Sequence, residues 1–375
     1  MKRRKPFFLL TCLSLLMIAC TPEPPMPEGM PVTDPVQNPT YSGFYLLNEG
    51  TMGANKAILD YFDYATGYYQ NDVFSKRNPQ VVDGLGDVGT GLYVYGSKMY
   101  AIINGSNLVE VMDAKTATHL ASLQIPNARS AAFANGKAYF SSYAGQMQTD
   151  GTQLGFVIEV DTVSLMLGRQ VTVGRQPEEM VVKDGKLFVA NSGGYTPENY
   201  DNTISVVNMD SFVEEEKIPV AINLYRMFLA PNGTLYVSSR GNYADVASNL
   251  YAVNTMDKTV KALGKGVTAY AIKDDVAYII DIVYGPAPLY QTEYHYYTLQ
   301  LNTQQIDNSS FLSDDVKKQI VYPYSIAVHP ITGDILVTDA ANFVTPGTLF
   351  YCNVQGQLQW KQTTGDIPGS IAFWQ

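Results

Sequence analysis

The sequence predicts an all-β protein: a seven-bladed β-propeller with four-stranded blades, closed by a C-terminal innermost strand that joins the N-terminal blade. Three observations lead to this prediction. The 375 residues include 27 tyrosines and 30 glycines but only 16% charged residues, a composition that favours strands and turns over helices. Short hairpin turns recur along the chain, and the segments at its two ends resemble complementary strands of one hairpin.

The recurring turns lie between apolar runs, as in "SAAFANGKAYFSS" around Asn135-Gly136 and "MVVKDGKLFVANSG" around Asp184-Gly185. Asn-Gly and Asp-Gly suit tight hairpins because their turn residues need positive φ angles. The interval between these turns is that of a four-stranded propeller blade. A pair of β-sandwiches is the competing interpretation, but it would not produce one period from end to end.

The two ends of the predicted propeller complete one blade. The chain enters it with "GFYLLNEG", which is similar to the second strand of a hairpin, and ends with "GDIPGSIAFWQ", which is similar to a first strand. We therefore expect the C-terminal strand to become the innermost strand of the blade formed by residues 43–70. This arrangement would pair both terminal edges and leave no open sheet.

The first 42 residues have a different composition. Residues 1–19 combine a basic start with an apolar run that is short for a membrane span, and Cys20 follows directly. This pattern predicts a lipoprotein signal peptide and lipidation of Cys20. A plain signal peptide is the alternative. Residues 20–42 are rich in proline and predict an extended tether, followed by the propeller at residues 43–375. We expect an outer membrane lipoprotein, exposed at the cell surface and monomeric on its own.

Seven polar connectors are expected between the second and third strands of the blades. In a propeller such connectors share one rim with the beginnings of the innermost strands, where function is often placed. Tyrosines and short amide side chains recur in them, as in recognition surfaces, although solvated loops have a similar composition. The predicted ligand-binding residues are Asn48, Glu49, Met52, Asn104, Arg129, Tyr143, Arg175, Asn191, Tyr195, Arg226, Arg240, Tyr243, Asp281, Tyr284, Asn342 and Phe343.

Cations stand at equivalent positions of this repeat. Arg129 and Arg226 both lie seven residues before a turn glycine, at the start of an innermost strand. Around a channel mouth they could hold a phosphate or carboxylate group. Glu178 shares their register, so a structural ring of ion pairs is an equally good interpretation.

No pattern in the sequence predicts catalysis. The three histidines lie in different blades without metal-ligand spacing, and neither a nucleophile elbow nor a phosphate-binding loop is present. We therefore expect no enzyme activity and no catalytic cofactor. A metal-dependent lactonase is a weaker alternative, in which Glu49 would bind an ion together with Asn48, Asn104, Asn191 and Asp281. The net charge of −10 makes nucleic acid a poor partner.

Several longer runs, among them "NEGTMGAN", "LDYFDYATG", "GLGDVGTGLYVYGSKMY" and "VGRQPEEMVVKDGKLFVANSGG", resemble YncE-like propeller lipoproteins, and within that group the BtuG-type corrinoid-binding lipoproteins. The resemblance extends over residues 43–375. It implies that a corrinoid such as cobalamin is the bound ligand and that a TonB-dependent outer-membrane transporter is the partner. The alternative is a surface propeller that binds a glycan, a peptide or another protein.

Overall fold

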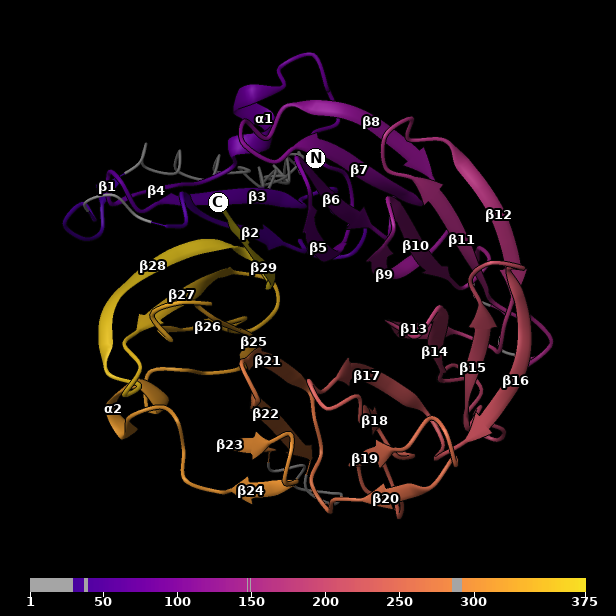
Figure 1. The fold of residues 1–375 in the computed structure, drawn as a ribbon. Coiled ribbons are helices and arrows are strands. Elements are labelled where there is room, and N and C mark those ends of the chain that lie inside the picture. The colour runs from indigo at the N-terminus through magenta and orange to yellow at the C-terminus, as the bar shows by residue number, and fades with distance from the viewer. Residues whose placement is uncertain (1–29, 37–39, 147, 149, 285–291) are drawn as a thin grey trace, which may run out of the picture.

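The structure, a computed structural model, describes residues 30–36, 40–146, 148, 150–284 and 292–375. The strands form seven antiparallel sheets arranged as a wheel (Figure 1), which confirms the predicted seven-bladed propeller. The signal peptide and Cys20 lie outside the described residues. In the described ranges, no helix is both long and apolar enough to cross a membrane.

Each blade is given from its first, innermost strand to its fourth. The first three blades contain β29 (Pro368–Trp374), β2 (Gly43–Asn48), β3 (Ile58–Asp63) and β4 (Tyr68–Gln70); β5 (Gly89–Tyr95), β6 (Lys98–Ile103), β7 (Leu108–Asp113) and β8 (His119–Gln124); and β9 (Ala128–Ala134), β10 (Lys137–Ser142), β11 (Phe156–Asp161) and β12 (Leu167–Thr172). Blades 4 and 5 contain β13 (Pro177–Lys183), β14 (Lys186–Asn191), β15 (Thr203–Asn208) and β16 (Val213–Pro219); and β17 (Leu224–Leu229), β18 (Leu235–Ser239), β19 (Asn249–Val253) and β20 (Val260–Ala262). Blades 6 and 7 contain β21 (Ala269–Lys273), β22 (Val276–Tyr284), β23 (Thr292–Gln300) and β24 (Gln305–Asp307); and β25 (Pro323–Val328), β26 (Ile335–Asp339), β27 (Pro346–Cys352) and β28 (Leu358–Asp366). Two short helices, α1 (Val73–Arg77) and α2 (Asp314–Lys317), follow β4 and β24.

The C-terminal strand closes the wheel as the sequence predicted. β29 pairs with β2 from Gly43 opposite Trp374 to Asn48 opposite Pro368, so the last strand of the chain becomes the innermost strand of blade 1. β2 therefore has a pairing strand on both edges, β29 on one and β3 on the other.

The tight turns between first and second strands also follow the prediction. Asn135 and Gly136 have φ angles of 51° and 72°, and Asp184 and Gly185 have φ angles of 51° and 72°. A Cβ atom at Gly136 or Gly185 would meet no atom within 4 Å. The backbone conformation, rather than crowding, therefore explains glycine at these positions.

The core is divided among the blade interfaces. The buried apolar side chains of the described residues form seven clusters, each shared by two neighbouring blades. Leu47 of blade 1 and Met99 of blade 2 belong to one cluster, and Val206 of blade 4 and Val237 of blade 5 belong to another. Cys352 lies in the cluster between blades 6 and 7 as a fully buried free thiol. Each blade is thus stabilised mainly by its two neighbours.

Part of the predicted tether lies against the propeller. β1 (Met30–Pro31) pairs with β4 as a fifth strand on the outer edge of blade 1. The Val32 amide donates to the Gly67 carbonyl at 2.9 Å, and the Val36 amide donates to the Tyr64 carbonyl at 2.8 Å. Proline is tolerated here because an edge strand does not need every amide for pairing.

A fully buried carboxylate joins the outer strands of blade 1. Asp60 of β3 accepts hydrogen bonds from Asn48 Nδ2 (2.9 Å), Tyr69 OH (2.9 Å), Asn71 Nδ2 (3.3 Å) and the Asp72 amide (3.0 Å). Burial raises the pKa of Asp60 to about 6, although these hydrogen bonds act to lower it. The folded protein therefore holds the Asp60 proton more tightly than the unfolded chain.

This raised pKa predicts a pH-dependent stability. Its stabilising contribution is complete below the ordinary carboxyl pKa of 3.8 and is lost as the pH rises through about 6. Compared with Asp60→Asn, which cannot titrate, we expect the wild type to lose on the order of 3 kcal/mol of unfolding free energy between about pH 4 and 7. Urea unfolding at several pH values measures the difference, with Asp63→Asn on the same strand as control. A difference between wild type and Asp60→Asn that stays constant with pH would contradict the prediction.

Candidate functional site

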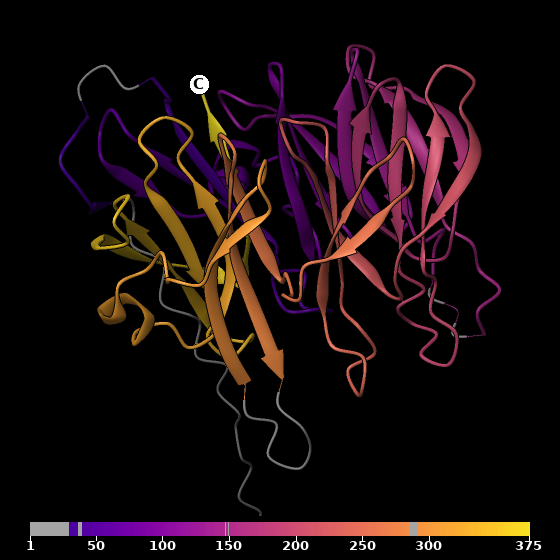
Figure 2. The same cartoon turned by 60° about the horizontal axis from the view of Figure 1, so that its bottom comes forward.

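The long connectors and the beginnings of the first strands lie on one rim of the wheel. The antiparallel order of every blade places the connectors between second and third strands on the face opposite the tight turns (Figure 2). Within the connector from β22 to β23, residues 285–291 lie outside the described residues. The rim geometry that the sequence predicted is therefore present in the described part of the chain.

β-bulges shape the beginnings of the first strands. In blade 4, Pro177 pairs with Asn191 but Met180 pairs with Val189, so one extra residue is accommodated on β13. Comparable shifts occur in β5, β9, β17, β25 and β29, whereas β21 pairs regularly. A bulge breaks the alternation of side chains. Adjacent residues such as Glu178 and Glu179 can then both take part in contacts between blades.

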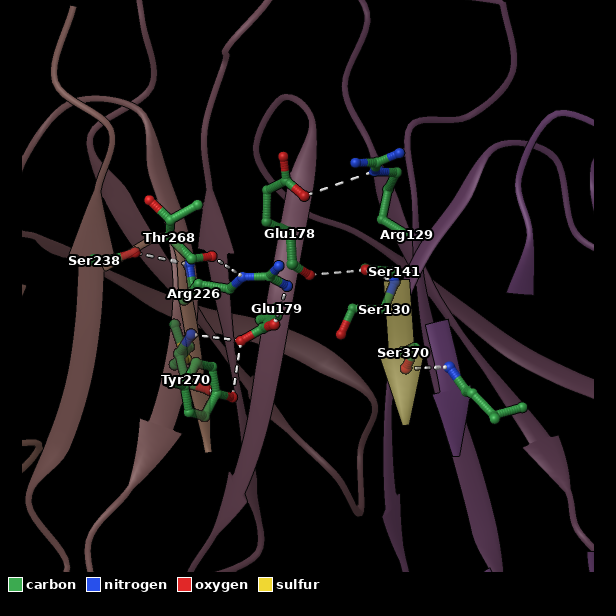
Figure 3. A network of polar contacts seen from close by, with 12 residues as sticks. Arg129, Ser130, Ser141, Glu178, Glu179, Arg226, Ser238, Thr268, Tyr270 and Ser370 are labelled. Carbon is green, nitrogen blue, oxygen red and sulfur yellow. Dashed lines mark hydrogen bonds and ion pairs between the residues drawn. The ribbon is translucent and has the colours of Figure 1, made fainter. Parts of the chain in front are cut away.

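Hydroxyl groups fasten these bulges to neighbouring blades (Figure 3). Ser141 Oγ accepts from the Ser130 amide at 3.1 Å within blade 3 and donates to the Glu178 carbonyl of blade 4 at 2.9 Å. Thr338 Oγ1 has the same role, because it accepts from the Ser325 amide at 2.9 Å and donates to the Pro368 carbonyl at 2.7 Å. The bulges are therefore held in place from both sides.

Glu178 is the centre of a charged cluster on this rim. Its carboxylate accepts from Arg240 Nη1 at 3.0 Å and from the Tyr143 hydroxyl at 2.6 Å, and it lies 3.6 Å from Arg129 Nε. Burial would raise the pKa of Glu178, but Arg240 and Arg129 outweigh it and hold the pKa below its usual value. Two guanidinium groups thus share one carboxylate, which leaves one positive charge unbalanced within the cluster.

Arg226 has a different environment from Arg129. Its Nη1 donates to Glu179 Oε1 at 2.7 Å, and its Nε donates to the Thr268 carbonyl at 3.1 Å. Glu179 Oε2 also accepts from the Met227 amide at 2.8 Å and the Tyr270 hydroxyl at 3.0 Å (Figure 3). The charge of Arg226 is therefore balanced inside the protein, as in the ion-pair alternative.

Tyr225 lies between these two charged groups. The guanidinium carbon of Arg240 is 3.5 Å from the centre of its ring, and that of Arg226 is 4.2 Å away. Both contacts have the geometry of cation–π interactions. Tyr225 is not among the residues predicted from the sequence, but its place beside Arg226 in a bulge brings it to the site.

An open pocket of about 260 Å³ lies over the cluster. It is lined by Arg129, Tyr143, Glu178, Ser192, Gly194, Tyr195, Asn223, Arg240 and Tyr243. The residues Tyr195 and Tyr243 are 53% and 67% exposed, so they are available to a ligand. Two buried atoms at the pocket, Arg129 Nε and Asn223 Oδ1, have no hydrogen-bond partner among the described residues. The structure thus brings five of the predicted residues together at one cavity with unsatisfied polar groups.

Glu49 lies close to this cluster. Its Oε1 accepts from the Tyr324 hydroxyl at 2.9 Å, and its charge interacts with Arg129 and Arg226. Burial raises the pKa of Glu49 to about 7, which the Tyr324 hydrogen bond and the two arginines counteract only in part. Glu49 therefore changes charge near neutral pH.

The remaining predicted aromatic residues form a second group on the rim. Phe343 contacts Tyr322 and Tyr324 edge-on, with ring centres 4.6 and 5.8 Å apart. The hydroxyls of Tyr284 and Tyr322 are 2.6 Å apart and share a hydrogen bond. Tyr225 lies near both Tyr322 and Tyr324, and its ring also contacts Arg240 of the pocket, so it connects this group to the pocket.

Other predicted residues support the blades instead of the pocket. Asn48 donates to Asp60, and Asn104 donates to the Ala128 carbonyl at 2.8 Å. Asn191 accepts from the Gly174 amide, and Asp281 accepts from the Gly266 amide. These four side chains belong to blades 1, 2, 4 and 6, and each is held by a hydrogen bond of its own. Among the described residues, moreover, no group of three or more His, Cys, Asp or Glu side chains could hold a metal ion.

Two predicted residues stand apart from the pocket. Met52 is 81% exposed. The Asn342 Oδ1 accepts from the amides of Val344 and Thr345, so its side chain stabilises its own turn.

Arg175 connects two rim connectors. Its Nε donates to Asp201 Oδ1 at 2.7 Å, and its Nη2 donates to the Asn199 carbonyl at 2.5 Å. Its Nη1 lies 3.5 Å from the Gly151 carbonyl of the connector between β10 and β11. Because the Arg175 side chain is only 8% exposed, we interpret it as a clamp that positions the loops around the pocket.

This clamp predicts a specific loss of stability. Arg175→Ala leaves Asp201 without its buried partner and should lower the free energy of unfolding by about 3 kcal/mol. Hydrogen exchange in residues 191–202 should become faster. Lys186→Ala is the control, since Lys186 and its partner Glu215 are 40% and 39% exposed and their separation should cost far less stability. Equal losses in the two variants would contradict the assignment of Arg175 as a buried clamp.

Comparisons with known proteins agree with the fold. The structure is similar to hydrazine synthase of Kuenenia stuttgartiensis, with a TM-score of 0.57 and 12% identity over 75% of this chain and 88% of that chain. It is also similar to a quinonprotein alcohol dehydrogenase-like protein of Bacteroides thetaiotaomicron, with a TM-score of 0.58 and 12% identity over 89% of this chain and 78% of that chain. At this identity the likeness concerns the fold alone.

A search of curated proteins gave no match. Residues 42–352 match a family described as a domain of unknown function, DUF5074. Because the match includes most of the propeller, the chain belongs to the DUF5074 family.

Proposed function

We propose that this propeller is a ligand-binding protein without a catalytic role and that its rim binds a corrinoid such as cobalamin. The observation that carries the proposal is the pocket in which Arg129 and Arg240 share Glu178 beside the exposed rings of Tyr195 and Tyr243. This arrangement offers a positive charge, unsatisfied polar atoms and aromatic surface in one place.

The chemistry of a corrinoid fits these features. It combines a wide ring edged with amides and a nucleotide tail that carries one phosphate. The positive charge of two guanidinium groups that share one carboxylate suits the phosphate. A pocket of about 260 Å³ can take only this end of the ligand, so the ring would lie across the rim against tyrosine side chains.

The wider setting of the proposal comes from the sequence. A lipid on Cys20 would hold the propeller at the outer membrane, and the ligand would pass to a TonB-dependent transporter. The proline-rich segment and the resemblance to BtuG-type lipoproteins support this setting. The alternative ligands, a glycan or a peptide, would use the same aromatic rim but would have less need of the positive cluster.

Titration of the purified chain with cyanocobalamin tests the proposal. We expect one saturable site with a dissociation constant below about 1 µM in calorimetry. Arg129→Gln and Arg240→Gln should each weaken binding about 10- to 100-fold, since each removes a charge-assisted contact worth about 1.5–3 kcal/mol. Cobinamide, which lacks the nucleotide tail and its phosphate, should bind less tightly to the wild type and should be nearly indifferent to both substitutions.

Arg169→Gln serves as the control, because it removes an arginine that does not line the pocket and pairs with Glu159 instead. Thermal unfolding of each variant shows whether the blade remains intact. Binding weaker than micromolar for every corrinoid would overturn the corrinoid proposal and favour the glycan or peptide alternative.

The raised pKa of Glu49 predicts that binding depends on pH. Below about pH 7 Glu49 is protonated and neutral, and above it the carboxylate adds a negative charge next to Arg129 and Arg226. A phosphate-bearing ligand should therefore bind several-fold more tightly near pH 6 than near pH 8. Glu49→Gln should remove most of this dependence, as measured by titration at both pH values. An unchanged pH dependence in Glu49→Gln would assign the effect to another group.

A further inference from the structure

The fourth strands of the blades differ in length, and this difference leaves one gap. β8 and β12 have six residues, β16 has seven and β28 has nine, whereas β4, β20 and β24 have three. In two of these three blades, residues that follow the short fourth strand form a further hydrogen bond to an inner strand. In blade 1 Asp60 binds the Asp72 amide ahead of α1, and in blade 5 the Leu263 amide donates to the Leu250 carbonyl.

In blade 6 the described residues after β24 supply no further backbone hydrogen bond to β23, although Asn308 and Ser310 line the cavity described below and Phe311 packs against Tyr296. β22 pairs with β23 along its whole length from Thr292 to Gln300, but β24 pairs only with Thr298, Leu299 and Gln300. Residues 292–297 of β23 therefore have a strand on one side only. In an antiparallel sheet half of their N–H and C=O groups point away from β22, so this edge presents unpaired backbone groups.

A cavity of about 310 Å³ lies at this edge. Its lining includes four consecutive residues of β23, from Tyr294 to Tyr297. Successive side chains of a strand point to opposite faces, so a cavity lined by four in a row lies beside the strand and not on one face of the sheet. Two of the tyrosines that line this cavity are held in place. Tyr297 OH donates to the Gly266 carbonyl at 2.7 Å, and Tyr296 packs against Phe311.

The cavity carries positive charge. Lys265 and Lys317 are lining residues, and no Asp or Glu is among the residues that line it. Lys317 pairs with Asp314 at 2.8 Å, whereas Lys265 forms no ion pair with a described residue. Asp281, which attracts Lys265, is buried and is not part of the lining. A carboxylate group of an occupant would give Lys265 the ion pair that the described residues do not supply.

We propose that the outer edge of β23 binds an extended, acidic peptide segment of a partner protein as an additional strand. The backbone of that segment would pair with residues 292–297, and its carboxylates would reach Lys265 and Lys317. The same molecule illustrates this geometry in blade 4. There the seven-residue β16, with Glu214, Glu215 and Glu216 in sequence, pairs along the third strand β15.

The β16 sequence supplies the probe. The heptapeptide Val-Glu-Glu-Glu-Lys-Ile-Pro, blocked at both ends, is added at up to millimolar concentration to the full chain, and hydrogen exchange is followed by mass spectrometry. We expect saturable protection of residues 292–297. A peptide with Gln in place of Glu should bind about five-fold more weakly. A peptide with N-methyl groups at alternate residues should give no protection, since it cannot form the ladder.

Variants of the protein test the charge. Lys265→Ala with Lys317→Ala should weaken binding of the acidic peptide several-fold but leave that of the Gln peptide unchanged, whereas Lys98→Ala in blade 2 should have no effect on either. Absence of protection by the acidic peptide, or equal protection by its N-methyl form, would overturn the proposal. Protection of residues 292–297 before any peptide is added would show that the chain itself occupies this edge, which would also overturn it.

Discussion

The pairing of β29 with β2 is the constraint on which the rest of the structure depends. Because the apolar clusters lie between blades, a blade at an open end would lose one of its two packing partners. Closure by the last strand gives blade 1 the same surroundings as the others. It also fixes the positions of the first strands around the axis, and these strands carry the charged residues of the rim.

The candidate site follows from irregularities placed on this regular frame. A bulge in β13 lets Glu178 face Arg129 and Arg240 while the adjacent Glu179 holds Arg226. Hydroxyl groups such as that of Ser141 then link each bulge to the neighbouring blade. The cluster is therefore built across blade boundaries, which explains how a rigid scaffold can present a positive pocket although the chain as a whole is acidic.

The regular features could be predicted from the sequence because each depends on local chemistry. Asn135-Gly136 identifies a hairpin from its own φ requirement, and the register of Arg129 with Glu178 follows from counting back to the turn glycine. The exceptions depend on tertiary contacts. Asn104 and Asn191 look like loop ligands, yet their amides bind nearby groups of the blades. Tyr225 and Glu179 could not be predicted because bulges bring them to the site, and a bulge leaves no clear pattern in a single sequence.

The short strand β1 also determines how the domain would respond to mechanical load. Met30 and Pro31 form only two ladder positions with β4, and Val32 and Val36 add single hydrogen bonds to the same blade. A pull on the residues before Met30 reaches these contacts before it reaches the six-residue β2. β1 and residues 32–36 would therefore separate from blade 1 first and lengthen the free segment before Gly43. Until they have separated, the pairing of β2 with β29 would carry no load.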